Sequence, residues 1–337
     1  MNTNAPSDDP LLPPFLADRL AGLDHDLAFR KGDEFAPWHD RLRSAWLATL
    51  PPHDSPAEGH AVGTAIRLRF ATGAEADGRF LLPDGPGPHP AVLLLHEHGG
   101  AFESGWQKLF DLPESQPARD QLYGGIAVAE ALRDAGFAVL CLDAIGFGAR
   151  FAGGYPAQQA LAANAIALGW SLAGIIAAED AQAAAWLARQ PGIDAERIGC
   201  FGFSFGGYRA WQLAAISPHV AAAASVSWMA TRESMMRPGA PLLQGHSAFS
   251  FLHPGIDHRA DFPDLAGLAA DRPLFFRSGR GDRHMPEDGV NAAWGRIAAI
   301  AEAAGGPPPD TGFHDHAHSC PPAIIEQATA FLRLHLT

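Results

Sequence analysis

The sequence predicts an α/β fold in which a mostly parallel central sheet is flanked by helices on both faces. Two observations carry this prediction. Short continuous apolar runs, typical of strands buried on both faces, recur along the chain, and helical patterns alternate with these runs. Of the 337 residues, 47% are apolar and 18% are charged, so the chain can bury a large core and is not expected to be disordered.

Residues 1–60 predict a helical extension in front of this domain. Apolar residues at near-helical spacing in it include Phe35, Trp38, Leu42 and Trp46. A proline-rich break follows at 51–56. We therefore expect an N-terminal helical extension over 1–60 and a single α/β domain over 61–337.

The elements of the domain follow in order from residue 64. Residues 64–70 alternate between apolar and charged side chains, as in a half-buried strand, and 80–82 predicts its partner. Continuous apolar runs predict buried strands at 91–95, 137–142, 197–203, 220–226 and 273–278. Helical patterns cover 125–135, 171–190, 206–215, 288–304 and 322–336.

Two irregular insertions, near 145–170 and 229–270, interrupt the alternation of strands and helices. Each follows the end of a predicted strand, and open α/β sheets bind their ligands at such ends. We therefore expect both insertions to border the functional site. The alanine-rich stretch 160–178 is too weakly hydrophobic for a membrane span, and it predicts a buried or amphipathic helix.

The charge balance and the cysteines exclude several classes of protein. The 24 basic and 37 acidic residues give a net charge of −13, which disfavours nucleic acid and anionic membranes as partners. Cys141, Cys200 and Cys320 are too few and too widely spaced for a disulfide framework. Residues 1–14 lack the basic and apolar regions of a signal peptide. We expect a cytoplasmic protein, for which homo-oligomer formation stays open.

The strongest chemical signal is the sequence Gly-Phe-Ser-Phe-Gly-Gly at Gly202–Gly207. It follows a predicted strand and precedes a predicted helix, the context of a nucleophile elbow. Glycines two residues before and after the serine allow the backbones to approach closely. The pattern therefore predicts Ser204 as a nucleophile, against the alternative of a glycine-rich turn without chemistry.

A serine hydroxyl needs a base and an orienting acid, which follow such an elbow in the chain order acid, then histidine. Asp282 comes directly after the strand predicted at 273–278, and we expect it to be the acid. The alternative is an ordinary turn residue, in which case Asp257 or Asp261 would be tested next. A histidine-rich loop precedes the last helix, and its exit is stiffened by two prolines. Within it we expect His318 to be the base, with His316 as the second candidate.

The oxyanion formed during acyl transfer needs two backbone N–H donors. One is expected from Phe205, the residue after the nucleophile, and the other from the loop after the strand at 91–95. That loop reads His-Glu-His-Gly-Gly at 96–100. We expect His98 to be the second donor, with Gly99 as the nearest alternative.

Several motifs together resemble the dienelactone-hydrolase-related and acetyl-xylan-esterase-like serine hydrolases of the α/β-hydrolase superfamily. They are Leu95–Gly100, Tyr123–Gly125, Leu142–Gly148 and Asp194–Gly199 leading into Gly202–Gly207. The resemblance covers about 90–335 and implies the α/β-hydrolase fold with Ser204, Asp282 and His318 as its triad. Dienelactone hydrolases use a cysteine nucleophile, so the serine here points to ordinary ester hydrolysis.

The resemblance also bears on Glu97, because dienelactone hydrolases carry a glutamate in the oxyanion loop that interacts with the resting nucleophile. Glu97 stands at that position. An equally acceptable expectation is a loop carboxylate that pairs with Arg150 or Arg209.

Sixteen histidines raise a metal-dependent hydrolase as an alternative. The candidate ligands are His96 and His98, the cluster His314, His316 and His318, and the group His246, His253 and His258. None of them shows a known metal-site spacing, so we expect no metal and no other cofactor.

Two further classes of protein are alternatives to an esterase. A binding module that kept the fold would be expected to have lost a triad member, and all three are present. A serine peptidase or amidase of the same fold stays open, although the short extension is too small for a propeller domain. Aromatic residues in the loops, above all Trp228 and Phe147, either line the pocket for a small-molecule ester or pack within the insertions.

Overall fold

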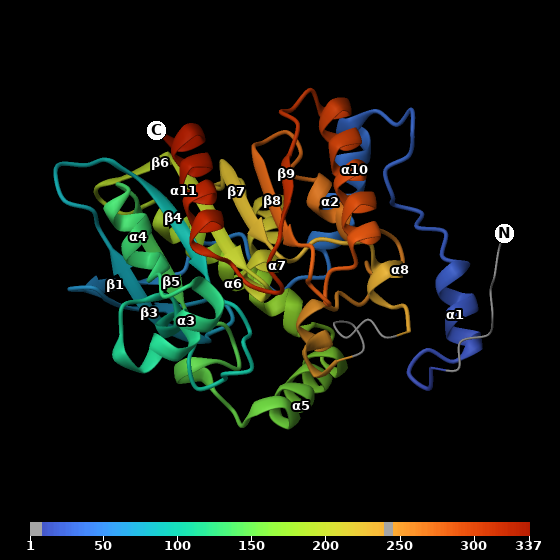
Figure 1. Cartoon of the computed structure of the whole chain (residues 1–337), viewed down its shortest axis with the longest axis horizontal. Coiled ribbons are helices and arrows are strands. Elements are labelled where there is room, and N and C mark those ends of the chain that lie inside the picture. Colours follow the sequence, from blue (N-terminus) through green and yellow to red (C-terminus); the bar gives the residue numbers. More distant parts are fainter. Residues whose placement is uncertain (1–8, 239–244) are drawn as a thin grey trace.

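The structure is a computed structural model, and it describes residues 9–238 and 245–337. Within these residues one nine-stranded sheet runs through the molecule in the order β1-β2-β3-β5-β4-β6-β7-β8-β9 (Figure 1). The strands are β1 (Glu58–Val62), β2 (Ala65–Arg69), β3 (Glu75–Leu81), β4 (His89–Leu95), β5 (Ala138–Leu142), β6 (Ile193–Phe203), β7 (Ala222–Val226), β8 (Leu274–Gly279) and β9 (Asp310–His314).

The sheet is parallel from β5 to β9 and antiparallel from β1 to β3, and β3 pairs antiparallel with β5. The carboxyl ends of β4, β6, β8 and β9 therefore meet at one edge of the sheet. The residues predicted for the triad and the oxyanion hole each follow one of these four strands, so the topology gathers them there. The predicted mostly parallel sheet is confirmed.

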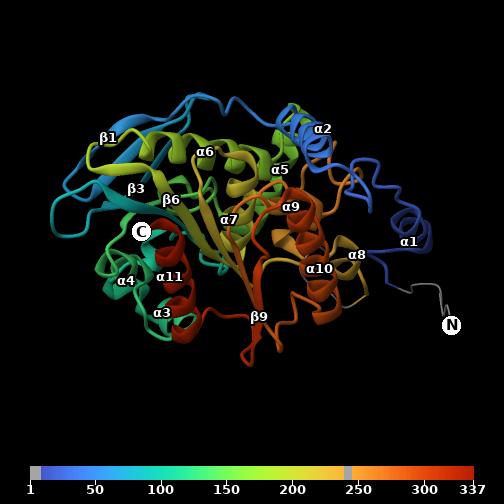
Figure 2. The ribbon, with the colours of Figure 1, turned by 90° about the horizontal axis from the view of Figure 1, so that it is seen from above.

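Helices cover both faces of the sheet, as Figure 2 shows from above. One face carries α2, α6, α7, α9 and α10, and the other carries α4 and α11. In β4, Leu93 and Leu95 join the first core while Val92 and Leu94 join the second, which explains the continuous apolar run. The helices are α1 (Pro14–Ala21), α2 (Phe35–Leu47), α3 (Gln116–Tyr123), α4 (Val128–Asp134), α5 (Gly154–Ala167), α6 (Leu172–Leu187), α7 (Phe205–Ile216), α8 (Arg232–Met235), α9 (Phe262–Gly267), α10 (Glu287–Ala304) and α11 (Pro322–Leu336).

The insertion near 145–170 is more regular than the sequence suggests. It contains the 14-residue helix α5, and the helix expected over 160–178 is in fact two helices that meet at 85°. Gly169, at φ +88°, lies in the break, where other residues are strained. The insertion near 229–270 holds the short helices α8 and α9 and a 3₁₀ segment at 246–251. The expectation of an irregular segment is therefore wrong for the first insertion. For the second insertion it misses the short helices.

No single helix in the described part of the chain combines the length and hydropathy that a bilayer span requires. The bent pair α5 and α6 meets the criteria of length and composition when its two helices are taken together.

The N-terminal extension is helical, as predicted, and it shares the core of the sheet domain. Trp38, Leu42 and Trp46 of α2 are at most 1% exposed and belong to the same apolar core as the strands. The sheet itself begins at Glu58, slightly inside the segment 1–60. Trp46 also packs edge-on against His253 of the second insertion, with ring centroids 5.4 Å apart.

His253 is expected to make the stability of the fold depend on pH. Its side chain is fully buried, its Nε2 lies 2.7 Å from Gln212 Oε1, and burial lowers its pKa to about 3. In the unfolded chain this histidine takes up a proton near pH 6.5, whereas in the folded chain it stays neutral down to about pH 3. The free energy of unfolding is therefore unaffected by this group above pH 6.5 and decreases as the pH falls towards 3. Over this pH range the loss of unfolding free energy due to His253 is at most about 5 kcal/mol.

Between pH 7 and pH 4.5 the free energy of unfolding should decrease in both the parent and His253→Gln. We expect the decrease to be about 2–3 kcal/mol smaller in His253→Gln. Urea unfolding at the two pH values measures this difference. His60→Gln, at an exposed histidine of β1, is the matched control and should behave as the parent. An equal loss in His253→Gln and the parent would rule out His253 as a source of the acid sensitivity.

Candidate active site

Ser204 occupies the sharp turn between β6 and α7. Its backbone has φ 56° and ψ −122°, a strained conformation for a residue with a side chain. A Cβ atom on Gly202 would come within 2.2 Å of the Gly206 backbone, and one on Gly206 within 1.9 Å of the Leu95 carbonyl oxygen. Only glycine fits at both positions, so the elbow expected from the motif is confirmed as a backbone feature.

The structure brings Ser204, His318 and Asp282 together from three separate strand ends. His318 Nε2 lies 2.8 Å from Ser204 Oγ, and His318 Nδ1 lies 2.7 Å from Asp282 Oδ2. A carboxylate can only accept, so Nδ1–H donates to Asp282 and Nε2 is free to accept from the serine hydroxyl. The Asp282 side chain is completely buried, while 23% of His318 stays exposed.

A second histidine, His284, helps to hold this arrangement. Its backbone N–H donates to Asp282 Oδ1 at 2.9 Å, so both oxygens of that carboxylate are engaged. The His318 ring lies between two other rings, with centroid distances of 4.7 Å to His284 and 4.9 Å to Phe203. Burial and the neighbouring His318 lower the pKa of His284 to about 4. Sequence reasoning missed His284, although it stands only two residues after Asp282.

The other histidines of the final loop have different surroundings. His314 is the last residue of β9 and is buried, and its Nδ1 accepts the backbone N–H of His316 at 3.3 Å. Burial and the neighbouring His316 lower the pKa of His314. His316 is exposed. Of the three histidines, His318 alone forms a hydrogen bond with Ser204 among the described residues.

The loop 96–100 leaves β4 beside the elbow, and its two histidines are buried and neutral. His96 Nδ1 donates to the Glu97 carbonyl at 2.9 Å, and its Nε2 accepts the Ala144 N–H at 3.1 Å. Burial holds the pKa of His96 well below its usual value and lowers that of His98 to about 4. Both imidazoles therefore act as fixed hydrogen-bonding groups and not as cations at neutral pH.

His98 ties this loop to both insertions. Its Nε2 lies 3.3 Å from Oε1 of Gln158 on α5, and Gln158 Nε2 donates to Ser250 Oγ at 2.9 Å. All three side chains are buried. One amide side chain thus joins both insertions to the loop that follows β4.

Lys108 approaches the loop from a 3₁₀ turn at Trp106–Leu109. Its Nζ donates to the backbone oxygens of Glu97 and His98 at 3.0 and 2.8 Å. Only 1% of the residue is exposed, and burial lowers its pKa to about 8. A lone lysine in an irregular segment gave no signal in the sequence.

Glu97 is buried and accepts a hydrogen bond from Tyr123 Oη. Its Oε1 has no hydrogen-bond partner among the described residues. The expected pairing of Glu97 with Arg150 or Arg209 is wrong, because two carboxylates of α6 take up both guanidinium groups. These pairs are Arg150 with Glu179 and Arg209 with Asp180.

The family model described as the abhydrolase family matches residues 112–303, more than half of the chain. The chain belongs to the abhydrolase family.

Individual relatives of this abhydrolase agree with the family match. A Bacillus subtilis (strain 168) protein named as a hydrolase, YtaP, is 24% identical over 219 residues, which are 65% of this chain and 69% of that protein. A crystal structure from Bacteroides fragilis, described as that of an acetyl xylan esterase, has a TM-score of 0.69 at 17% identity, covering 93% of this chain and 84% of the other. A glucuronoyl esterase from Solibacter usitatus has a TM-score of 0.65 at 16% identity, covering 93% and 97%.

The expected α/β-hydrolase fold and the expected hydrolase are therefore confirmed. The likeness to acetyl-xylan-esterase-like enzymes holds at the level of the fold. The finer likeness to dienelactone hydrolases stays a prediction.

The two aromatic residues expected to line the abhydrolase's substrate pocket are buried. Trp228 is 1% exposed and packs on Tyr208 and Phe251, and Phe147 is completely buried. The alternative left open by the sequence, packing within the insertions, describes both better, because their large rings fill the space under the loops. Exposed aromatic residues of the first insertion are Phe151 and Trp170, each 39% exposed.

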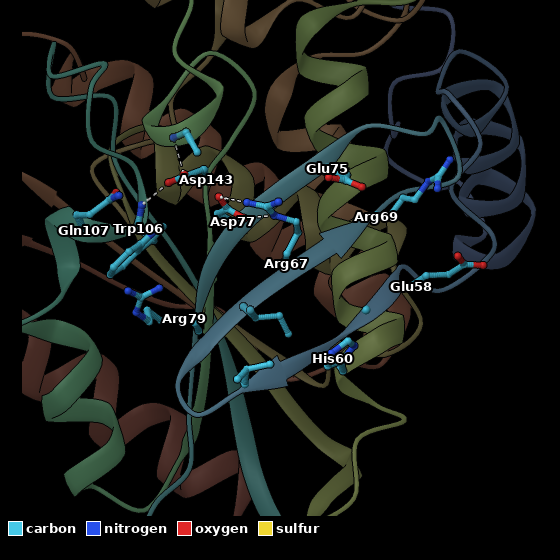
Figure 3. A pocket seen from close by; sticks show the side chains of 15 residues that line it. Glu58, His60, Arg67, Arg69, Glu75, Asp77, Arg79, Trp106, Gln107 and Asp143 are labelled. Carbon is cyan, nitrogen blue, oxygen red and sulfur yellow. Dashed lines mark hydrogen bonds and ion pairs between the residues drawn. The ribbon is translucent and has the colours of Figure 1, made fainter.

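A hollow of about 800 Å³ lies over β1–β3 (Figure 3). Arg79 lies over the Trp106 ring at 4.0 Å, and Arg67 forms an ion pair with Asp77 across neighbouring strands. None of Ser204, His318 and Asp282 lines this hollow. A smaller hollow of about 430 Å³ adjoins Asp282 and is bordered by arginines, including Arg280 and Arg283.

Among residues 9–238 and 245–337, no three His, Cys, Asp or Glu side chains are grouped so that they could hold a metal ion. The side chain of His246, one of the candidate ligands, lies outside the described part of the chain. The three cysteines are free thiols and all are buried.

Proposed function

We propose that this abhydrolase is a serine esterase that works through an acyl-enzyme intermediate. One observation carries the proposal: His318 bonds Ser204 Oγ with one ring nitrogen and the buried carboxylate of Asp282 with the other. The bond to Asp282 fixes the tautomer in which Nε2 can accept the serine proton. This is the arrangement that activates a serine hydroxyl for attack on a carbonyl carbon.

In the proposed reaction Ser204 Oγ attacks the ester carbonyl while His318 takes the hydroxyl proton. The tetrahedral intermediate then collapses, the alkoxide leaves with the proton from His318, and an acyl-serine remains. Water activated by the same imidazole attacks the acyl-serine, which releases the acid and restores the free enzyme. Asp282 stabilises the imidazolium in both steps.

The oxyanion is proposed to bind the backbone N–H groups of Phe205 and His98. Phe205 is the first residue of α7, where an N–H has no acceptor within the helix and the helix dipole favours negative charge. His98 lies in the loop that follows β4, and β4 pairs with β6 up to Leu95 and Gly202. This pairing places the loop beside the elbow.

The proposed substrate is a small-molecule ester carried by a carbohydrate. The structural neighbours are described as acetyl xylan esterases and glucuronoyl esterases. Phe151 and Trp170 offer exposed aromatic faces of the kind on which sugar rings pack. The buried Trp228 and Phe147 would support the wall of the site from behind.

Active-site labelling and a substrate panel test this function together. A fluorophosphonate probe is expected to label Ser204, as read by peptide mass spectrometry. p-Nitrophenyl acetate, acetylated xylo-oligosaccharides and glucuronate methyl esters should be hydrolysed faster than aminoacyl anilides, and dialysis against EDTA should leave the rates unchanged. Labelling at another residue, or turnover of anilides alone, would contradict the proposal.

Asp282→Asn is expected to lower kcat by about 10⁴-fold, because an amide at this position favours the tautomer in which Nε2 carries the proton. The fold should persist, since the His284 N–H can still donate to the remaining carbonyl oxygen. Steady-state kinetics with p-nitrophenyl acetate measure the loss. If the loss is below tenfold, the acid lies elsewhere.

A further inference from the structure

Lys108 is a buried cation that, among the described residues, donates to backbone oxygens and not to a carboxylate. Its residue is 1% exposed, and no ion pair to Nζ occurs among the described residues. Two backbone oxygens accept from its Nζ, and its charge lies 4.7 Å from the Phe147 ring centroid. The burial of an unpaired charge is unfavourable by several kcal/mol. This cost at Lys108 has to be offset by a gain elsewhere.

The two carbonyl groups that Lys108 binds belong to consecutive peptide units. In a planar trans peptide, the C=O of one residue and the N–H of the next point in opposite directions. With the Glu97 and His98 oxygens directed at Nζ, the N–H groups of His98 and Gly99 point away from it, side by side. Gly99 has φ +59°, so a left-handed residue follows His98, as in backbone nests that bind anions.

The turn that carries Lys108 is itself fixed. Asp143, which follows β5, accepts the Trp106 N–H at 3.0 Å, and its other oxygen accepts the Ala149 N–H at 2.9 Å. The bond between Trp106 and Asp143 is drawn in Figure 3. Ser115 Oγ donates to the Gln107 carbonyl at 2.7 Å. The ammonium therefore approaches the loop 96–100 from a rigid support.

The opposite side of the loop lies beside the elbow. Leu95, the residue before the loop, pairs with Gly202, and its carbonyl lies so close to Gly206 that only a glycine fits. The N–H groups that point away from Lys108 are thus held close to the turn that carries Ser204.

We propose that Lys108 is a positioning residue that aims the His98 and Gly99 N–H groups at the oxyanion and strengthens them through its charge. The inference rests on the proposed serine esterase function and adds a residue to it. A cation on the carbonyl side of a peptide unit polarises the N–H on the other side, which makes it a stronger donor. Lys108 does not touch the substrate.

Lys108→Met keeps the length and the apolar stem of the side chain and removes the donors and the charge. Loss of one oxyanion donor typically costs 10²–10³-fold in kcat, so we expect a fall of about 10²-fold with KM changed less than threefold. The rate of labelling by the fluorophosphonate probe should fall in parallel, because the same donors bind the phosphoryl oxygen. Circular dichroism and the unfolding temperature show whether the variant is folded.

Arg119→Met is the matched control. Arg119 is 2% exposed and also donates to backbone oxygens, those of Phe110 and Leu112, in the segment that carries Lys108. Its loss should lower the unfolding temperature and leave kcat within threefold of the parent. If Arg119→Met lowers kcat as much as Lys108→Met, Lys108 has a structural role alone and the inference is overturned.

The pH dependence of kcat offers a second test. Burial lowers the pKa of Lys108 to about 8, so kcat is expected to fall as the pH rises through about 8, and Lys108→Met should lack this fall. The charged and titratable groups that face the ammonium are Glu97, His96 and His98 in the loop and its start, Asp143 and Cys141 at β5, and Arg209 on α7. Burial raises the pKa of Cys141 well above its usual value, so the thiol stays neutral in this range.

The two proposals fail in distinguishable ways. If Ser204 is labelled in the parent but Lys108→Met reacts at the parent rate with an unchanged alkaline profile, the role of Lys108 is overturned and the esterase function stands. If the parent is not labelled at Ser204, the esterase function fails, and the inference about Lys108 fails with it.

Discussion

Replacement of Ser204 by alanine is expected to lower kcat by about 10⁶-fold, because no other group can take the place of the attacking hydroxyl. The residual rate would come from binding and from the oxyanion donors. Alanine tolerates the backbone at φ 56° about as well as serine, so the unfolding temperature should stay close to that of the parent. Hydrolysis of p-nitrophenyl acetate, followed together with thermal unfolding, measures both quantities.

Ser227→Ala is the matched control for this experiment. Ser227 also has a positive φ, 53°, and its buried Oγ has no hydrogen-bond partner among the described residues. The same substitution there should leave kcat within a few fold. A folded Ser204→Ala variant with the parent rate would overturn the proposed function altogether.

His318→Ala is expected to lower kcat by 10⁴-fold or more, while His316→Ala should retain most of the activity. The reason is reach, since a general base must lie within about 2.6–3.2 Å of the proton that it removes. His318 Nε2 lies 2.8 Å from Ser204 Oγ, whereas His316 is exposed two residues earlier. The pair of variants is its own control, because both remove an imidazole from the same loop.

The reverse result has a definite meaning. An inactive His316→Ala variant beside an active His318→Ala variant would show that the base is His316. The assignment of the base and the course of the loop between β9 and α11 would then be wrong, and the serine nucleophile would be unaffected.

The strands of the sheet centre could be predicted from sequence because burial on both faces leaves a continuous apolar run. β1 and β9 escaped prediction, since both are edge strands with few buried side chains and no such run. The first half of helix α5 also escaped prediction. Three of the six alanines of this helix are exposed, so no continuous apolar stripe marks one face.

The candidate site likewise contains residues that could be predicted from the sequence and residues that could not. Ser204 is marked by a local motif, because the elbow itself requires glycines at fixed offsets. Asp282 and His318 could be located from chain order and from the strand ends that they follow. The contacts of Lys108, Gln158 and Glu97 could not, because each joins segments whose proximity only the folded chain defines.

The hydrogen-bonded series His98–Gln158–Ser250 bears on how this enzyme could be re-engineered. Loop transplantation is a usual route to a new substrate range, and the two insertions are the obvious segments to exchange. Exchange of one alone would break the series at Gln158, and a buried amide without partners costs about 1–3 kcal/mol. The imidazole beside it would lose its orientation as well. For transplantation the two insertions therefore form one module, to be moved together or with Gln158 and Ser250 retained.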